Sequence, residues 1–307
     1  MDRARLEAVS RFLAALGTRR GLVRGLLVVV AAGTAGLPAE EAATRRWPGK
    51  RKARRQRRRR NRRGRVRGAN CDVCQDERSC AFSSIQAAIR AATTANPTVR
   101  VCNGTYQETV VIDRTVTLLG VPNAGGRPTI DAKGNGTTLT VNEGVTAVLF
   151  NLTLTGGHAP SGGGVVNRGN LRLQGCEVSG NDAAGQTFGN GGGVLNTQQG
   201  ILFAADTIVR KNNAKADGSM GGGLFNDHGQ VTLSDCLVSD NEAKLFGGGI
   251  ANSGGKLVLQ ATRVTQNEAS NGGGLFNQSA GQVTLAEGSR VFANKPDNCQ
   301  GTNACAA

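Results

Sequence analysis

The sequence predicts an all-β protein whose body is a right-handed parallel β-helix solenoid, with a short N-terminal capping helix and a disordered N-terminal leader. Of 307 residues, 45 are Gly and only 4% are aromatic, so the chain lacks the large side chains that fill a wide core. The motif Gly-Gly-Gly-apolar-x-Asn occurs five times, and its Asn residues are 25 to 30 positions apart. Such a period, with period-two alternation after each motif, is typical of a solenoid of short strands.

Each repeat contributes two Asn residues at sharp bends between strands, where Asn tolerates the left-handed backbone conformation. Coils of a β-helix stack about 4.8 Å apart, so the side-chain amides of one column can hydrogen-bond to those above and below. We therefore predict two inward structural ladders. They are Asn167, Asn196, Asn226, Asn252 and Asn277, and then Asn181, Asn212, Asn241, Asn267 and Asn294.

A further inward column of small residues includes Cys176 and Cys236. These two cysteines are two coils apart, about 9–10 Å, which exceeds the reach of an unstrained disulfide. Both are therefore predicted to be buried free thiols. Cys299 and Cys305 lie close together near the end of the sequence, and we predict a local disulfide between them that closes the C-terminal end.

Residues 69–108 are predicted to form a cap that covers the open end of the stack. Ser83 followed by Gln86 has the form of a capping box, and apolar residues at helical spacing follow it. The cap also contains four cysteines, for which disulfides are favoured over a zinc site and the pairing is left open. They are Cys71, Cys74, Cys80 and Cys102.

The leader differs sharply in charge from the body. Residues 1–68 hold 21 of the 37 Lys and Arg residues but only four acidic residues, whereas the body is close to neutral. Thr18-Arg19-Arg20-Gly21-Leu22-Val23 resembles a twin-arginine export signal, and the uncharged stretch after it is shorter than the roughly 20 residues of a membrane span. We expect an exported protein, extracellular or at the cell surface. Its expected parts are an export signal (1–43), a disordered Arg-rich linker (44–68) and the β-helix domain (69–307), with coils over 109–297 and a C-terminal Cys closure over 298–307.

Residues 50–67 contain 13 basic residues and no acidic residue, so self-repulsion favours a disordered segment. The partners expected for it are an anionic membrane or an acidic wall polymer. Nucleic acid is the weaker alternative, because the run has no aromatic side chain that could stack on bases.

The repeats resemble those of right-handed parallel β-helix proteins of the pectin lyase-like superfamily. Within it they are similar to secreted bacterial proteins with Gly-Gly-Gly-Ile-x-Asn repeats, in the style of polymorphic outer-membrane protein repeats. The resemblance rests on the Gly triplets with their Asn residues, on residues 84–92, on Gly104-Thr105-Tyr106-Gln107-Glu108 and on Asp297-Asn298-Cys299. It implies the fold more than a function, because members of the superfamily include lyases, hydrolases, esterases and adhesins.

The best acidic cluster of the body follows the second Asn column. This cluster forms a column that consists of Asp182, Asn213, Glu242, Glu268 and Lys295, with Asp240 close to Glu242. Its weak catalytic candidates are Asp240, Glu242 and Glu268, which we interpret as a solvated loop edge. His158, in Gly156-Gly157-His158, resembles part of a hydrolase signature but lacks the accompanying Asp, so we interpret it as a loop residue. We expect no cofactor and no metal, with Ca²⁺ left open because a lyase of this fold would hold it with several carboxylates.

A second candidate surface is an outward apolar column that includes Leu195, Phe225 and Phe276. Alternation places these side chains away from the core, where exposed rings could stack on sugars or contact a partner. The alternative is that the loops of variable length fold over them.

Together these observations favour a non-catalytic, adhesin-like module that binds a polysaccharide or another cell-surface component. The alternative is a polysaccharide lyase or glycoside hydrolase that acts on an acidic polysaccharide. A tight acidic cluster would favour the enzyme, whereas an exposed apolar column without titratable groups would favour binding.

Overall fold

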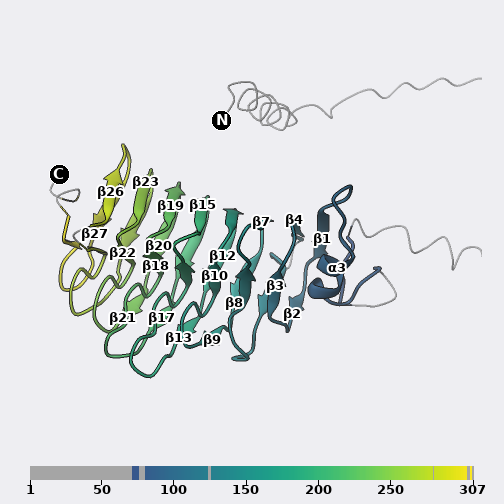
Figure 1. Cartoon of the computed structure of the whole chain (residues 1–307), viewed down its shortest axis with the longest axis horizontal. Coiled ribbons are helices and arrows are strands. Elements are labelled where there is room, and N and C mark those ends of the chain that lie inside the picture. The colour runs from purple at the N-terminus through teal and green to yellow at the C-terminus, as the bar shows by residue number, and fades with distance from the viewer. Residues whose placement is uncertain (1–70, 76–79, 124–125, 279, 303–304, 306–307) are drawn as a thin grey trace, which may run out of the picture. The chain divides into compact units, whose positions relative to one another are not determined.

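The computed structural model describes residues 71–75, 80–123, 126–278, 280–302 and 305. Within them the chain winds through successive coils, and the strands of neighbouring coils pair in parallel (Figure 1). Three sheets have eight strands each and a fourth has four. The predicted all-β parallel solenoid is therefore confirmed.

We name the sheets A to D. Sheet A contains β1 (Thr98–Cys102), β4 (Val116–Val121), β7 (Thr146–Phe150), β11 (Asn170–Gln174), β15 (Ile201–Ala205), β19 (Gln230–Ser234), β23 (Lys256–Gln260) and β26 (Gln282–Leu285). Sheet B contains β3 (Val110–Ile112), β6 (Leu139–Val141), β10 (Val165–Asn167), β14 (Val194–Asn196), β18 (Leu224–Asp227), β22 (Ile250–Ser253), β25 (Leu275–Asn277) and β28 (Cys299–Gln300).

Sheet C follows sheet A in each coil, and in four coils a strand of sheet D follows sheet C. Sheet C contains β2 (Thr105–Tyr106), β5 (Thr129–Asp131), β8 (Thr153–Thr155), β12 (Glu177–Ser179), β16 (Ile208–Arg210), β20 (Leu237–Ser239), β24 (Arg263–Thr265) and β27 (Arg290–Phe292). Sheet D contains β9 (His158–Ala159), β13 (Asp182–Ala183), β17 (Asn213–Ala214) and β21 (Glu242–Ala243).

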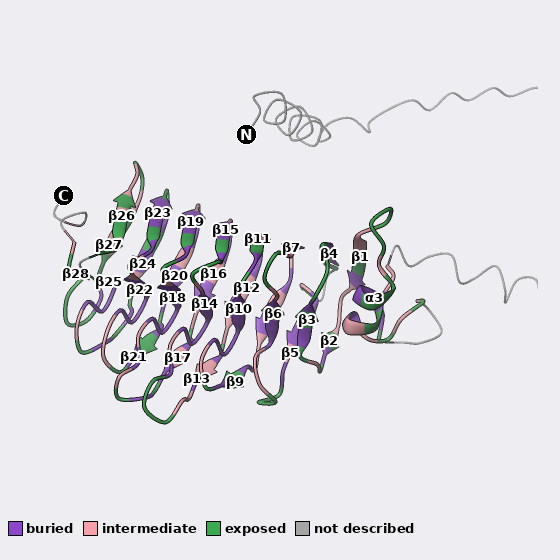
Figure 2. Ribbon diagram, in the orientation of Figure 1, coloured by how far each residue is buried: buried purple, intermediate pink, exposed green. Residues whose placement is uncertain are grey.

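Side-chain alternation along each strand separates the core from the surface. In β11, Leu171 and Leu173 are buried while Asn170 is exposed, and the same pattern recurs in the strands of sheet A above and below it (Figure 2). Stacking these strands joins their aliphatic side chains into one continuous narrow core. Because every second residue points outward, any functional side chain on a strand lies in a column that runs from coil to coil.

The Gly triplets have a steric cause that the sequence pattern did not show. The first Gly of each triplet, such as Gly191, has a positive φ, here 69°. A β-carbon on the second, Gly192, would collide with the backbone of Asn213, and one on the third, Gly193, would meet the side-chain amide of Asn212. The triplet is therefore required for close contact between this part of the coil and the second Asn column.

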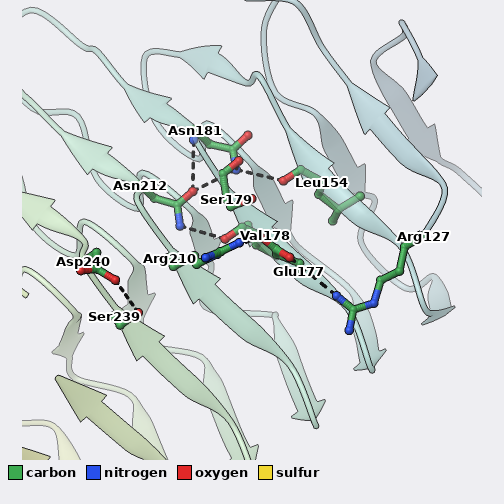
Figure 3. Close-up of polar contacts among 10 residues, drawn as sticks. All are labelled: Arg127, Leu154, Glu177, Val178, Ser179, Asn181, Arg210, Asn212, Ser239 and Asp240. Carbon is green, nitrogen blue, oxygen red and sulfur yellow. Dashed lines mark hydrogen bonds and ion pairs between the residues drawn. The ribbon is translucent and has the colours of Figure 1, made fainter. Parts of the chain in front are cut away.

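Both predicted Asn ladders are present and buried. In the first, Asn167 Nδ2 donates to Asn196 Oδ1 at 2.7 Å, and the pattern continues to Asn277. In the second, Asn181 Nδ2 donates to Asn212 Oδ1 at 3.0 Å, and each following amide repeats this bond (Figure 3). These chains of amides satisfy polar groups that burial would otherwise leave unpaired.

The cysteines follow the predicted division between paired and free. Cys176 and Cys236 are free and buried, as their two-coil separation predicts. Cys299 and Cys305 form the C-terminal disulfide. In the cap, where the pairing was open, the disulfides join Cys71 to Cys102 and Cys74 to Cys80.

The capping helix, α3 (Ile85–Ala91), packs at the start of the stack but does not use the predicted capping box. Its N-cap is Ser84, which accepts from Ala87 N, and the Gln86 side chain bonds instead to the backbone of Val111. Glu108 supplies the second cap, because its carboxylate accepts from the N–H groups of Ile85 and Gln86 at 2.7 and 3.0 Å. The physical reason is that a carboxylate from the first coil reaches these free N–H groups directly.

The predicted export signal and the Arg-rich linker, residues 1–43 and 44–68, lie outside the described residues. Among the residues that the structure describes, no helix is long and apolar enough to cross a membrane.

Candidate functional site

The outward residues of sheet D form a column of polar and titratable side chains along successive coils. Strand pairing aligns His158, Asp182, Asn213 and Glu242. Parallel bridges extend the column to Glu268 and then to Lys295, its last residue. The column expected from the sequence, from Asp182 to Lys295, is therefore one coil longer and begins with a histidine.

At the start of this column, His158 lies beside Asp182 in the next coil. The imidazole Nδ1 is 3.9 Å from Asp182 Oδ2. The same carboxylate accepts from Asn213 Nδ2 at 3.0 Å and from Lys215 Nζ at 3.0 Å. The histidine side chain is 56% exposed and the Asp182 side chain 29%, so the pair is open to a ligand while the carboxylate is held from the protein side.

Two glycines place His158 in register with Asp182. Gly156 has a φ of 70°, and Gly157 N donates to the buried Asn181 Oδ1 at 2.9 Å. A β-carbon on Gly157 would collide with the backbone of Gly163, so any larger residue would push the chain away from the stack. In later coils the equivalent segment is a residue with positive φ, then the ladder Asn, then a polar residue. The segment Gly156-Gly157-His158 takes its place and puts an imidazole where those coils have Asp182 or Glu242.

A separate ion-pair cluster lies on sheet C in the coil of Asp182. Glu177 Oε1 accepts from Nε and Nη2 of Arg210, both at 2.9 Å, and Glu177 Oε2 lies 3.6 Å from Arg127 Nη1 (Figure 3). Three coils are therefore joined by one carboxylate between two guanidinium groups. One carboxylate oxygen thus accepts two N–H groups of the same guanidinium, and these contacts hold the Glu177 side chain in place.

The structure places the three predicted catalytic candidates on the later coils. Asp240 occupies a left-handed bend position, with φ of 55°, and accepts from Ser239 Oγ at 2.8 Å (Figure 3). Glu242 and Glu268 are exposed and stand in adjacent coils of the sheet D column. No described basic side chain forms an ion pair with any of the three, so their arrangement gives no fixed orientation comparable with that of Asp182.

The predicted apolar column on sheet B does not form an exposed surface. Phe225 is only 4% exposed, and Leu195 and Phe276 are partly buried. Phe246, from the loop between β21 and β22, stacks on Phe276 with ring centroids 4.2 Å apart. The physical reason is that the loops of variable length fold back over sheet B, which was the alternative considered from the sequence.

The described side chains contain one group that is close enough to share a metal ion, and its chemistry does not suit one. Among them, the one group of three or more His, Cys, Asp or Glu side chains with ligand atoms close enough to share an ion consists of Cys74, Cys80 and Cys102. All three sulfurs belong to disulfides, so the group does not fit a metal site. The acidic column likewise does not gather the six to eight oxygen ligands that Ca²⁺ takes.

The second histidine, His228, lies in the turn between sheets B and A. Its Nδ1 is 2.7 Å from Oδ1 of the adjacent Asp227, and both side chains are exposed. This pair is formed by sequence neighbours, and no described lysine or asparagine orients its carboxylate. It therefore serves as an internal comparison for the His158 site.

Sequence reasoning missed the pairing of His158 with Asp182. The signal was present: extending the column back by one coil of 24 residues from Asp182 leads to His158. The sequence alone does not define the register of this coil, because Gly157 stands where the later coils have the ladder Asn.

No family model matches this sequence, and no curated protein matches it. Solved structures similar to it include the pectin methylesterase from Aspergillus niger, with 14% sequence identity and a TM-score of 0.39, over 76% of this chain and 86% of that chain. The pectin methylesterase from carrot is also 14% identical, with a TM-score of 0.42, over 76% and 88% of the two chains. The described residues form a parallel β-helix, and both the place of the chain in the pectin lyase-like superfamily and its repeat subtype stay a resemblance.

From the sequence, catalysis stayed uncertain with a leaning toward a non-catalytic module, and the comparisons contradict that leaning. The solved structures named above are pectin methylesterases, which are enzymes. What they share with this chain is the fold, so the chemistry has to come from the site itself.

Proposed function

We propose that this chain is an exported, polysaccharide-active enzyme that hydrolyses an ester bond on the polymer, with His158 and Asp182 as its acid–base centre. The observation that carries the proposal is the exposed imidazole of His158 next to a carboxylate that Asn213 and Lys215 hold in place. General acid–base catalysis requires a base whose orientation is fixed by a second group, here a carboxylate that is itself held in place.

Asp182 fixes the working tautomer of the imidazole. A carboxylate beside Nδ1 favours the form with hydrogen on Nδ1, which leaves the lone pair of Nε2 free as the base. The separation of 3.9 Å is longer than a hydrogen bond, and such catalytic contacts are often loose before a substrate binds. Because Asn213 and Lys215 restrain the carboxylate, it is the imidazole that moves toward the carboxylate when the contact shortens.

The hydrolytic step then balances without a further co-reactant. His158 Nε2 takes a proton from water, and the resulting hydroxide attacks the acyl carbon of the ester. The ammonium group of Lys215 stabilises the negative charge that forms on the acyl oxygen. The imidazolium returns its proton to the leaving alkoxide, which gives an acid and an alcohol.

The scaffold suits a linear polymer better than a small molecule. Polar side chains repeat along sheet D once per coil, about every 4.8 Å. This rise is comparable to the length of one sugar ring in a polysaccharide, so successive sugars can meet successive coils. Three disulfides among the described residues support an exported protein, because disulfides persist in oxidising compartments.

A second candidate is glycoside hydrolysis by Glu242 and Glu268. These residues occupy equivalent positions in adjacent coils, so their backbones are about 4.8 Å apart. Retaining glycosidases hold two carboxyl groups about 5–5.5 Å apart. The ester hydrolase is preferred because neither glutamate is oriented by a described partner, whereas Asp182 is oriented by two.

The two candidates are separated by what is released. The full chain is incubated with methyl-esterified and with acetylated polygalacturonic acid, and free methanol, acetate and polymer length are followed together. We expect release of alcohol or acid at constant polymer length, abolished by His158→Asn. Shortening of the polymer that is lost in Glu242→Gln and Glu268→Gln would favour the glycosidase over the ester hydrolase. If the polymer is not shortened and no alcohol or acid is released, both candidates are rejected.

A further inference from the structure

The outward face of sheet C carries two arginines directly above one another. Arg263 on β24 and Arg290 on β27 are paired in register, so their backbones are about 4.8 Å apart. Both side chains are exposed, while Val264 between Arg263 and Thr265 points into the core. The two guanidinium groups are therefore presented from adjacent coils on the same side of the sheet.

These arginines differ from Arg210 on the same sheet. Arg210 is neutralised by Glu177, whereas neither Arg263 nor Arg290 has an ion pair or side-chain hydrogen bond to any residue that the structure describes. Like charges in directly opposed positions repel each other, so the folded chain alone does not stabilise this arrangement. An anion between the two groups would convert the repulsion into two charge-assisted hydrogen bonds.

An exposed aromatic ring completes the surface. Phe292 is two residues after Arg290 on β27, so both side chains leave the same face of the strand, and Phe292 is 42% exposed. Thr265 is its in-register neighbour on β24. A flat ring next to two guanidinium groups matches a sugar ring that carries a carboxylate, since the apolar face of the sugar can stack while its carboxylate is bound.

Nearby carboxylates restrict which polyanion fits. Asp206 and Asp235 line a cavity of about 470 Å³ together with Arg263, and Glu268 follows Thr265 around the next bend. Duplex DNA carries one negative charge per roughly 1.7 Å and would place phosphates over these acids. A polyuronate carries one charge per sugar, so its carboxylates can meet the arginine column and leave the acidic residues uncovered.

We infer that Arg263, Arg290 and Phe292 form a binding surface for an acidic polysaccharide, separate from the site at His158. The part of this surface in turnover on the polymer rests on the proposed function. Arg263 lies three coils beyond Asp182, and Arg290 lies four, which is about 14 and 19 Å along the stack. A polymer can reach both places at once, whereas an oligosaccharide of two or three sugars cannot.

The test measures binding separately from turnover. Affinity for polygalacturonic acid, for a neutral galactan and for duplex DNA is determined with the full chain in the His158→Asn background. Arg263→Gln with Arg290→Gln is compared with Arg172→Gln with Lys256→Gln, which removes the same charge from sheet A, where Arg172 lies over the ring of Phe203.

We expect the sheet C double variant to lose at least about tenfold affinity for polygalacturonic acid, and the sheet A variant to lose less than about twofold. Equal losses in the two variants, binding of the galactan as tight as that of the acid, or preference for DNA would each overturn the inference. With His158 restored, the sheet C variant should act normally on a short ester substrate but poorly on the polymer. If the sheet C variant acts on the polymer as fast as the unchanged protein, the binding surface is refuted but the proposed reaction is not. If the protein binds polygalacturonic acid specifically but hydrolyses no ester, the proposed reaction is refuted but the binding surface is not.

Discussion

The Nδ1 atom of His158 lies 3.9 Å from Oδ2 of Asp182, although 24 positions separate the two residues in the sequence. They meet because β9 and β13 are neighbours in sheet D and because both residues occupy the outward position of their strand. A solenoid builds such a site from one residue per coil, so the register of stacking decides which chemical groups meet.

Lys215 is predicted to matter for turnover, because its ammonium group both holds Asp182 and stabilises the developing oxyanion. Lys215→Met should lower the rate of ester hydrolysis by about 100-fold, which is typical for loss of one such group. Lys244→Met is the matched control, since Lys244 occupies the same place in the next coil and has no carboxylate partner among the described ion pairs. Equal rates for the two variants would remove Lys215 from the mechanism.

The second Asn ladder is predicted to carry a large share of stability. Asn241 Oδ1 accepts from the backbone and side-chain amides of Asn212, and its own amide donates to Val209 O and to Asn267. Asn241→Ala leaves these buried groups without partners and should lower the free energy of unfolding by about 2 kcal/mol or more. Chemical denaturation measures this.

Asn170→Ala, at an exposed position of β11, should change the free energy of unfolding by less than about 0.5 kcal/mol. If the Asn241 and Asn170 variants unfold at the same denaturant concentration, the hydrogen bonds of the ladder contribute little to the free energy of unfolding.

Phe225 is predicted to act as part of the packing under the loops and not as a ligand contact. Phe225→Ala should lower the free energy of unfolding by about 3–5 kcal/mol, as for other buried phenylalanines. Phe188→Ala, at a 63% exposed ring, should have little effect. An unchanged melting temperature for the Phe225 variant, together with lost polysaccharide binding, would restore the apolar column of sheet B as a binding surface.

The two free thiols are predicted to be inert in the folded protein. Burial raises the pKa of Cys176, and it raises the pKa of Cys236 to about 11 from an ordinary value of 9.0. Because the folded state keeps the thiols protonated, this contribution to stability is full below pH 9 and declines as pH rises toward 11. A thiol reagent at pH 8 should modify both residues only after unfolding, and rapid modification of the native protein would contradict their burial.

The fold was predictable because it depends on features that repeat. The Gly triplets, the Asn columns and the alternation each recur at the same period, so an error in one coil is corrected by the others. The prediction that Cys176 and Cys236 are free thiols followed from the same coil spacing.

The candidate site was less predictable because it depends on departures from the repeat. His158 stands in a coil where Gly157 replaces the ladder Asn, so its membership in the column was hidden. The cover over Phe276 comes from Phe246 in a loop whose length changes between coils. The helix cap from Glu108 is a contact between residues more than 20 positions apart, which no local motif encodes.

The most direct test of the central claim compares the two histidines. His158→Asn and His228→Asn each remove an exposed imidazole beside an aspartate, and only the first lies in the proposed site. With both variants shown to be folded by circular dichroism, ester hydrolysis on methyl-esterified polygalacturonic acid is measured for each. The account predicts a loss of at least about 100-fold for His158→Asn, in the range of general acid–base catalysis, and an unchanged rate for His228→Asn. Full activity of the His158 variant would contradict it.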